Sequence, residues 1–321
     1  MTLQFNRTAF DPETVRRLWK TQDTKKLSDE QSRARRYEER DDIVLAVNAA
    51  IVTRRPLLVY GPPGSGKSSL AGFVAEVLGW RYYEHVITSR TQALDLLWGF
   101  DAIRRLSDAQ AKTGSLPANH DYVEPGVLWW AFESGSALRR GAGTGVKLKA
   151  RPKDPARWGK SPHAVVLLDE IDKADPFVPN DLLIPLDRGS FDVTELNAHI
   201  ELPRDRRVLL VITTNGEREL APAFLRRCVQ LELKAPDLGQ LQRIAELHHG
   251  PDKEGLYEPV ANALLQLQRV AREKRVRPPS TAEFLDAIQA CRELRIRPGM
   301  GKEWELLTSG LLEKQSTFAG G

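Results

Sequence analysis

The sequence has little of several features that mark special classes of protein. Only two of its 321 residues are cysteine, and no apolar run approaches the roughly 20 residues that a membrane-spanning helix needs. The amino terminus also lacks the apolar core of a secretory signal. We therefore expect a cytoplasmic protein without membrane insertion. Cys228 and Cys291 are expected to be buried small hydrophobes, because they lie in strand-like and helix-like patterns.

An excess of charge of one sign is absent as well. The net charge is +4, which is small for a chain of 321 residues, so global electrostatics alone do not indicate a nucleic-acid partner. The composition is 41% hydrophobic and 28% charged, as in ordinary globular proteins. A chain of this length can bury one large core or two smaller ones.

A complete phosphate-binding loop is present. Residues 61–68 read GPPGSGKS, preceded by an apolar run at 57–60 and followed by a helical pattern that Gly79 can end. In such a loop the backbone N–H groups surround phosphate oxygens, the lysine reaches the β and γ phosphates, and the hydroxyl after it ligates Mg²⁺. The predicted nucleotide-binding residues are Gly61, Pro62, Pro63, Gly64, Ser65, Gly66, Lys67, Ser68 and Ser69.

Apolar runs predict five strands, at 57–60, 82–88, 164–168, 208–212 and 229–233. Helical patterns lie between them, so the economical solution is a parallel α/β sheet. From about Pro236 the chain reads as helix only, with a capping box from Ser280 to Glu283. The expected domains are an amino-terminal arm at 1–40, an α/β nucleotide domain at 41–235 and a helical domain at 236–321.

Insertions interrupt this pattern near 93–123, 139–160 and 191–202. The segment 139–160 carries eight basic residues against one acid, Asp154. Charge runs with glycine are usually solvated loops, and a polyanion contact is the alternative. Trp98, Trp129 and Trp130 are candidates for client docking, but buried packing is the favoured interpretation.

Two acids, Asp169 and Glu170, follow the strand at 164–168, where open α/β sheets place their ligands. We expect Asp169 to hold Mg²⁺ and Glu170 to activate the water that attacks the γ-phosphorus. Asp172 and Asp175 follow, and for both a capping or solvated role is favoured.

Further polar residues follow the strand at 208–212 and precede the strand at 229–233. Asn215 is the best candidate for sensing the γ-phosphate or holding the attacking water, although Asn before Gly216 is also a turn dipeptide. Arg226 and Arg227 directly precede Cys228, the last residue of the segment ELAPAFLRRC. An arginine at a subunit edge can complete the neighbour's site in trans.

These residues resemble the AAA+ ATPases and, more narrowly, their MoxR-like branch. The resemblance covers roughly 41–312 and rests on GPPGSGKS, LLDEIDKAD (167–175), TTN (213–215) and ELAPAFLRRC (219–228), in that order. It implies a P-loop AAA+ fold whose five-stranded sheet has the order 5-1-4-3-2, followed by a helical lid. It also implies a ring, usually of six subunits, with ATP at each interface.

By this resemblance Lys67 and Ser68 bind phosphate and metal, Asp169 is the acid on the metal side, Glu170 the base and Asn215 the first sensor. Arg227 is the first choice for the arginine finger and Arg226 the second. One position departs from the family: Ala282 stands where an arginine second sensor is expected. Arg277 or Lys274 is the hypothetical substitute.

The leading hypothesis is ATP-driven remodelling of a protein client by a ring, with a von Willebrand factor A-type partner. A DNA-processing motor, in which the basic insertion contacts the polyanion, and a slow nucleotide-gated scaffold are the alternatives. An ABC-type transporter is disfavoured because no LSGGQ-like segment separates Lys67 from Asp169. Residues 1–40 fit an arm packing on a neighbour or a flexible leader.

Overall fold

The computed structural model describes residues 9–20, 27–111, 116–143, 145–146, 148–274, 276–299 and 301–312. These residues form two compact units. One unit contains the described parts of 1–22, 41–60 and 74–231, and the other those of 23–40, 61–73 and 232–321. Residues 27–40 and 61–73 thus group with the carboxy-terminal helices, and the domain boundaries expected from the sequence stay a prediction. Residues 1–8 of the expected arm and Lys147 of the basic insertion lie outside the described residues.

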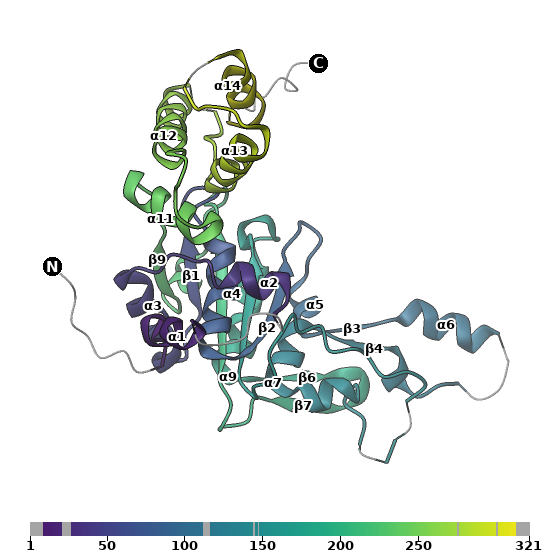
Figure 1. Cartoon of the computed structure of the whole chain (residues 1–321). Coiled ribbons are helices and arrows are strands. Elements are labelled where there is room, and N and C mark those ends of the chain that lie inside the picture. The colour runs from purple at the N-terminus through teal and green to yellow at the C-terminus, as the bar shows by residue number, and fades with distance from the viewer. Residues whose placement is uncertain are drawn as a thin grey trace. The chain divides into compact units, whose positions relative to one another are not determined.

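A five-stranded sheet organises the first unit, and its order from edge to edge is β2–β5–β8–β1–β9 (Figure 1). This is the order 5-1-4-3-2 predicted from the sequence. The strands are β1 (Leu57–Tyr60), β2 (Arg81–Val86), β5 (Ala164–Asp169), β8 (Val208–Thr214) and β9 (Val229–Glu232). The pairs β2–β5, β5–β8 and β8–β1 are parallel, with Tyr60 beside Thr214 and Leu168 beside Ile212. The carboxyl ends of β1, β5 and β8 therefore share one edge.

Helices precede and connect the strands. They are α1 (Pro12–Trp19), α3 (Asp41–Thr53), α4 (Lys67–Leu78), α5 (Ala93–Leu97), α6 (Ala102–Gln110), α7 (Val127–Leu138), α8 (Val178–Asp181), α9 (Leu183–Arg188) and α10 (Pro222–Leu225). A 3-10 turn, Ile171–Lys173, follows β5.

The described start of the amino-terminal arm packs against its own unit. Phe10 is fully buried, and the side chain of Asn48 on α3 accepts a hydrogen bond from its N–H at 3.0 Å and donates one to its carbonyl at 2.9 Å. Buried polar groups need such partners. The segment at Phe10 is therefore held against α3 of its own unit, and the role of the arm stays a prediction.

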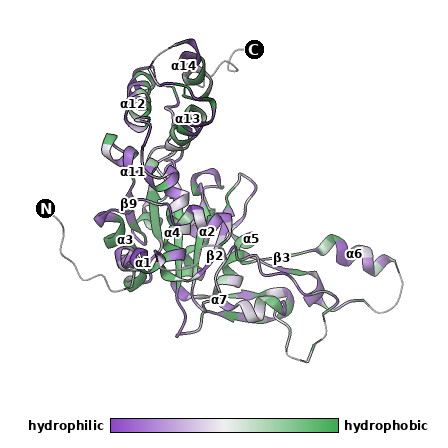
Figure 2. Cartoon of the chain, in the orientation of Figure 1, coloured by the Kyte–Doolittle hydropathy of each residue, from purple (hydrophilic) through white to green (hydrophobic). Residues whose placement is uncertain are grey.

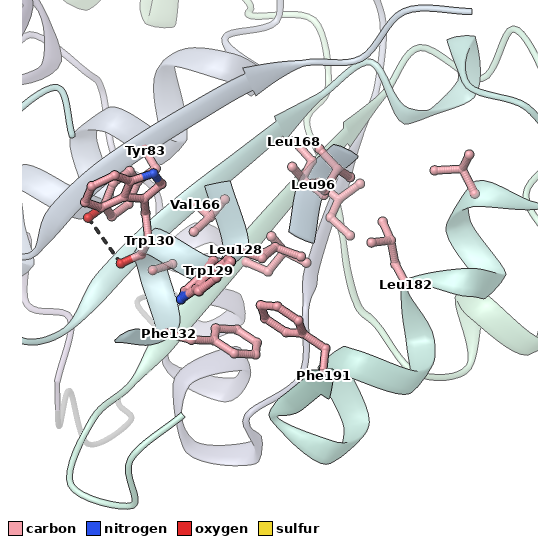
Figure 3. Close-up of a cluster of buried hydrophobic side chains, with 14 of the residues drawn as sticks. Tyr83, Leu96, Leu128, Trp129, Trp130, Phe132, Val166, Leu168, Leu182 and Phe191 are labelled. Atoms are coloured by element: carbon pink, nitrogen blue, oxygen red, sulfur yellow. Dashed lines mark hydrogen bonds between the residues drawn. The ribbon is translucent and has the colours of Figure 1, made fainter. Parts of the chain in front are cut away.

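One face of the sheet is covered by an aromatic core beneath α7 (Figure 3). Trp129 is fully buried, and Trp98 and Trp130 are 4% and 3% exposed. The hydroxyl of Tyr83 donates to the carbonyl of Trp130 at 3.3 Å. Burying each large apolar side chain stabilises the fold by about 1.5–3 kcal/mol. The three tryptophans thus pack in the core, as favoured, instead of docking a client.

Two of the predicted insertions form antiparallel hairpins: β3 (Trp98–Phe100) with β4 (Val123–Pro125), and β6 (Ser190–Val193) with β7 (Ala198–Glu201). Asn197 adopts a left-handed conformation in the second turn. Helix α6 extends from the β3–β4 ribbon away from the sheet (Figures 1 and 2). No residue of α6 is buried. Ile103 of α6 is 84% exposed.

The basic insertion is irregular and lies partly along the sheet edge. Tyr82 of β2 donates to the carbonyl of Trp158 at 3.0 Å and accepts from the N–H of Arg157 at 2.8 Å. Arg140, in contrast, is buried, donating to the carbonyl of Asp121 at 2.8 Å and pairing with Glu124 at 2.8 Å. The insertion is therefore not a wholly solvated loop, because Arg140 is a structural residue.

The second unit is helical, with α2 (Asp29–Ala34), α11 (Leu238–His249), α12 (Tyr257–Glu273), α13 (Thr281–Leu294) and α14 (Gly301–Leu307). The capping box predicted at Ser280 and Glu283 opens α13. Cys291 packs in the core of this unit and Cys228 in that of the first, and both are unpaired and buried, as expected. None of the described helices is long and apolar enough to cross a membrane.

Acid is expected to destabilise the second unit. Burial, Arg36 and His249 lower the pKa of His248 to about 4, below its ordinary 6.5. The unfolded chain then binds more protons between these values, so the stabilisation is complete above about pH 6.5 and is lost as the pH falls toward 4. The Tm should fall between pH 7 and pH 5, and less so in His248→Gln. Equal acid sensitivity of wild type and His248→Gln would contradict the assignment to His248.

Candidate nucleotide site

The phosphate loop begins directly after β1 and ends where α4 begins. Lys67, the first residue of α4, is 7% exposed, and its ammonium donates to the carbonyls of Gly61 at 2.8 Å and Pro62 at 3.0 Å. The charge of Lys67 is thus held over the loop itself. Ser68 stands in the first turn of the same helix, where a hydroxyl can reach a metal bound to phosphate.

Two glycines of the loop are required by its geometry. Gly61 has φ 145° and Gly64 has φ 75°, conformations that side chains rarely adopt. A Cβ on Gly61 would clash with the carbonyl oxygen of Leu233, and one on Gly64 with the side chain of Ser280. The loop is therefore packed against the start of α13 in the second unit and leaves no space for a side chain at Gly61 or Gly64.

The acids lie in the first unit, at the carboxyl edge of the sheet. Asp169 ends β5, and its Oδ1 accepts a hydrogen bond from the hydroxyl of Thr213 on β8 at 2.5 Å. The same hydroxyl oxygen accepts from the N–H of Glu170 at 2.9 Å. One threonine on the neighbouring strand therefore fixes both acids.

Glu170 has a left-handed backbone, with φ 62° and ψ 52°. Such a conformation costs about 1–3 kcal/mol in a residue other than glycine and is concentrated at functional sites. Its carboxylate accepts from the ammonium of Lys173 at 2.6 Å and lies 3.4 Å from the amide nitrogen of Asn215. The hydrogen bond to Glu170 raises the pKa of Lys173. The predicted base and the predicted sensor are thus in direct contact.

Asp172 positions the sensor loop. It is 4% exposed, and its Oδ2 accepts from the N–H groups of Asn215 at 3.1 Å and Glu217 at 3.0 Å. Asp175 accepts from the N–H of Phe177 at 3.0 Å. The capping interpretation agrees with the contact of Asp175. It is wrong for Asp172, which is neither solvated nor a cap of the next helix, because its buried carboxylate holds the backbone that follows β8.

Thr213 and Lys173 were not singled out from the sequence. Thr213 lies within the TTN motif, where a hydroxyl at the end of an otherwise apolar strand was the available signal. Lys173 lies three residues after Glu170, a spacing that allows an ion pair only if the chain turns there. The sequence position of Thr213 or Lys173 therefore does not indicate which side chain each residue contacts.

Replacing Thr213 with valine, which has nearly the same shape, should loosen the acid pair. Thr213 is 1% exposed, so the substitution leaves the Glu170 N–H without this partner, at a cost of about 1–3 kcal/mol in the free energy of unfolding. Denaturant unfolding and a titration with ATP and Mg²⁺ measure the two effects. The matched control is Thr214→Val, which removes only a bond from the Gly216 N–H at 3.0 Å and should leave nucleotide affinity nearly unchanged. Equal affinities in Thr213→Val and wild type would exclude the positioning role.

The two arginines after α10 lie at the opposite edge of the sheet, just before β9. Arg226 is exposed. Arg227 forms an ion pair with Asp187 at 3.0 Å and donates to the carbonyl of Ala223 at 3.1 Å. β5 has six residues and is therefore about 20 Å long. Neither arginine reaches Asp169 or Glu170 of its own chain.

The second-sensor position shows no cation. Ala282 is the second residue of α13, immediately after the segment that contacts Gly64. Arg277 lies 3.7 Å from Glu283, and Lys274 is an exposed residue that directly follows α12. Substitution by either residue stays a prediction.

Each group of residues matches a part of a nucleoside triphosphatase. The loop suits phosphate, Ser68 and Asp169 offer the hard oxygen ligands that Mg²⁺ prefers, and Glu170 can take a proton from water. Among the residues that the structure describes, no cluster of three or more His, Cys, Asp or Glu could hold a metal alone. A strand, phosphate loop and helix with an acid pair ending a parallel strand define a P-loop ATPase.

The family follows from comparison with known sequences. A family described as "AAA domain (dynein-related subfamily)" matches residues 56–228, more than half of the chain, and the chain belongs to this family. It is therefore a nucleotide-binding ATPase with an AAA+ fold. No curated protein matches the chain significantly.

Solved structures with a similar fold include two of RuvB from Thermotoga maritima. The P216G mutant is 15% identical, with 85% of this chain and 69% of that chain covered and a TM-score of 0.47. The second, titled a Holliday junction branch migration motor, is 13% identical, with 88% and 69% covered and a TM-score of 0.44.

Proposed function

We propose that this ATPase is a MoxR-like, Mg²⁺-dependent ring, usually of six subunits, that uses ATP hydrolysis to remodel a protein client. The observation that carries the proposal is the set of contacts at the carboxyl edge of the sheet. There Thr213 joins Asp169 to Glu170, and Asn215 lies against Glu170. A metal acid, a base and a polar sensor held together are what hydrolysis of a phosphoanhydride requires.

Different residues of the chain have different roles in the proposed hydrolysis. ATP supplies the phosphoanhydride bond, and the loop N–H groups with Lys67 neutralise its phosphates. Ser68 and Asp169 would be the protein ligands of Mg²⁺. Glu170 takes the proton of the attacking water, and Asn215 orients the same carboxylate. The glycine backbone that admits no Cβ fits a loop that closes on phosphate oxygens.

Action in trans is the proposed role of Arg227, with Arg226 as the second choice. The two arginines lie on the edge of the sheet opposite the acids, so a single subunit cannot place them at its own Glu170. A ring with head-to-tail interfaces presents one edge to the next subunit. This geometry supports an interfacial site.

A protein client is favoured because α6 extends from the β3–β4 ribbon with apolar side chains exposed. Helix α6 carries exposed Ile103 and Leu106 beside Arg104 and Arg105. Exposed apolar side chains suit contacts with protein. A von Willebrand factor A-type domain is the partner class that the MoxR-like resemblance implies.

DNA is the second candidate because of the basic insertion. Arg151, Lys153 and Arg157 are all exposed along an irregular segment. Cations at such spacing can follow a phosphate backbone, with an affinity that falls steeply with salt.

Affinity capture with the Glu170→Gln chain in ATP tests the client class. This chain should hold ATP without hydrolysing it and so keep its client bound. Protein should co-purify and nucleic acid should not, and capture should disappear in Lys67→Ala, which lacks the cation for the phosphates. Recovery of salt-sensitive nucleic acid alone would replace the protein-remodelling proposal with the DNA motor.

A further inference from the structure

A cavity of about 500 Å³ lies at the amino-terminal edge of the sheet in the first unit. Its walls include Pro56, Trp80 and Arg207, each directly before β1, β2 or β8, and Arg227, two residues before β9. The acids Asp169 and Glu170 follow the other ends of the strands. The cavity is therefore separate from the metal and base residues of its own chain.

Arginine dominates the lining of this cavity. Seven arginines line it against two acids, Asp187 and Glu201, an excess of five positive charges. Asp187 forms an ion pair with Arg227 at 3.0 Å, and Arg206 forms one with Glu133 at 3.1 Å. The remaining arginines are Arg54, Arg55, Arg188, Arg204 and Arg207.

These five arginines form no ion pair with any acid in the described part of the chain. The guanidinium of Arg207 donates to the carbonyls of Arg204 at 2.9 Å and Arg206 at 3.0 Å, and its backbone N–H donates to Nδ1 of His163 at 3.1 Å. Like charges gathered around one cavity repel one another. An anion that enters between them removes this repulsion.

Helix ends account for part of the cluster only. Helices α3 and α9 end beside Arg54 and Arg188, and the partial charge of about −0.5 at a helix carboxyl end attracts cations. Arg204 and Arg207 belong to the turn between β7 and β8, where no helix ends. Arg54 also has φ 57°, a conformation in which glycine is easier. The helix ends therefore explain the positions of Arg54 and Arg188 but not those of Arg204 and Arg207.

We propose that the cavity binds a short phosphate chain. Guanidinium groups match phosphate oxygens in planar, two-pronged hydrogen bonds, and a chain of three phosphates carries about as much negative charge as the five arginines carry positive. The volume lies within the range of small-ligand sites, about 300–1,000 Å³, in which a few phosphates fit. A longer polyanion would need a groove instead of a cavity.

The phosphate chain has two sources with the same chemistry. A free polyphosphate can enter the cavity of a single subunit. Alternatively, a second copy of this chain can present the phosphates of its ATP, since Arg227 lines the cavity too; this source rests on the proposed ring function.

Calorimetry with inorganic tripolyphosphate and the full-length Lys67→Ala chain tests whether free polyphosphate binds. At low salt we expect one equivalent to bind, and the double variant Arg54→Gln/Arg204→Gln in the same background should bind at least tenfold more weakly. The matched control is Arg151→Gln/Lys153→Gln, which removes two exposed charges from the basic insertion and should leave binding unchanged. Equal weakening by both pairs would overturn the cavity as the site. If Lys67→Ala does not fold, the intact chain saturated with a non-hydrolysable ATP analogue should still bind tripolyphosphate as a further equivalent.

ATP hydrolysis by the assembled chain tests the second-copy source. Arg54→Gln/Arg204→Gln should lower turnover at least tenfold, and mixing with Glu170→Gln chains should restore part of it. Loss of turnover without free tripolyphosphate binding assigns the phosphates to the second copy. The proposal is wrong if tripolyphosphate does not bind and the double variant hydrolyses ATP normally. Because free binding needs neither a ring nor turnover, an inactive wild-type chain that binds tripolyphosphate would contradict the proposed function and leave the cavity site intact.

Discussion

Replacing Glu170 with glutamine is expected to lower ATP turnover by about 10²–10⁴-fold while nucleotide binding stays close to wild type. Glutamine keeps the size of the side chain and can still lie against Asn215, but it cannot take a proton from water. Asp169 and Thr213, which remain joined at 2.5 Å, still hold the metal side of the site. Steady-state ATPase rates and a titration with a fluorescent ATP analogue separate the two effects.

Asp175→Asn is the matched control for this experiment. Asp175 lies five residues after Glu170, and its carboxylate accepts a hydrogen bond only from the nearby N–H of Phe177. Its neutralisation should leave the rate within about threefold of wild type, since surface substitutions change stability by no more than about 0.5 kcal/mol. An unchanged rate in Glu170→Gln would remove Glu170 as the base.

The sheet could be predicted because its information is local. Each strand is an apolar run short enough for a buried strand, and helical patterns between the runs force parallel connections. The order 5-1-4-3-2 came from the motifs at 61–68, 167–175 and 213–215, which fix the place of each strand within a known fold. The positions of Lys67, Asp169 and Asn215 relative to their strands were predictable for the same reason.

The partners of these residues could not be predicted, because they come from distant parts of the chain. Thr213 on β8 donates to Asp169 on the neighbouring strand β5, although the two residues are 44 positions apart in the sequence. Arg227 and its partner Asp187 are 40 positions apart. Phe10 likewise depends on Asn48 of α3. No periodicity encodes such pairs. They are set by the register of the sheet and by the turns that bring its edges together.

Arg227→Ala should lower turnover by about 10³–10⁵-fold, the loss typical of an arginine finger, although the residue lies at the edge of the sheet opposite Glu170. The physical reason is the loss of a positive charge where negative charge develops on the transferred phosphoryl group of the neighbouring subunit. Arg226→Ala removes the adjacent exposed arginine and provides the comparison, because the sequence predicts Arg227 first and Arg226 second. Steady-state ATPase rates of both variants, measured under conditions where subunits assemble, rank the two arginines.

Mixing two inactive chains then tests action in trans. An interface is complete when an Arg227→Ala subunit supplies intact Glu170 and its neighbour, a Glu170→Gln subunit, supplies intact Arg227. At an equal mixture with random assembly about one interface in four meets this condition, so activity should return to about a quarter of wild type in a closed ring of equivalent interfaces. The recovery should vary with the mixing ratio and peak near equality, because both kinds of subunit are needed. Activity that stays at the level of the separate variants at every ratio would show that Arg227 does not complete the neighbour's site, and recovery with Arg226→Ala in place of Arg227→Ala would move the role to Arg226.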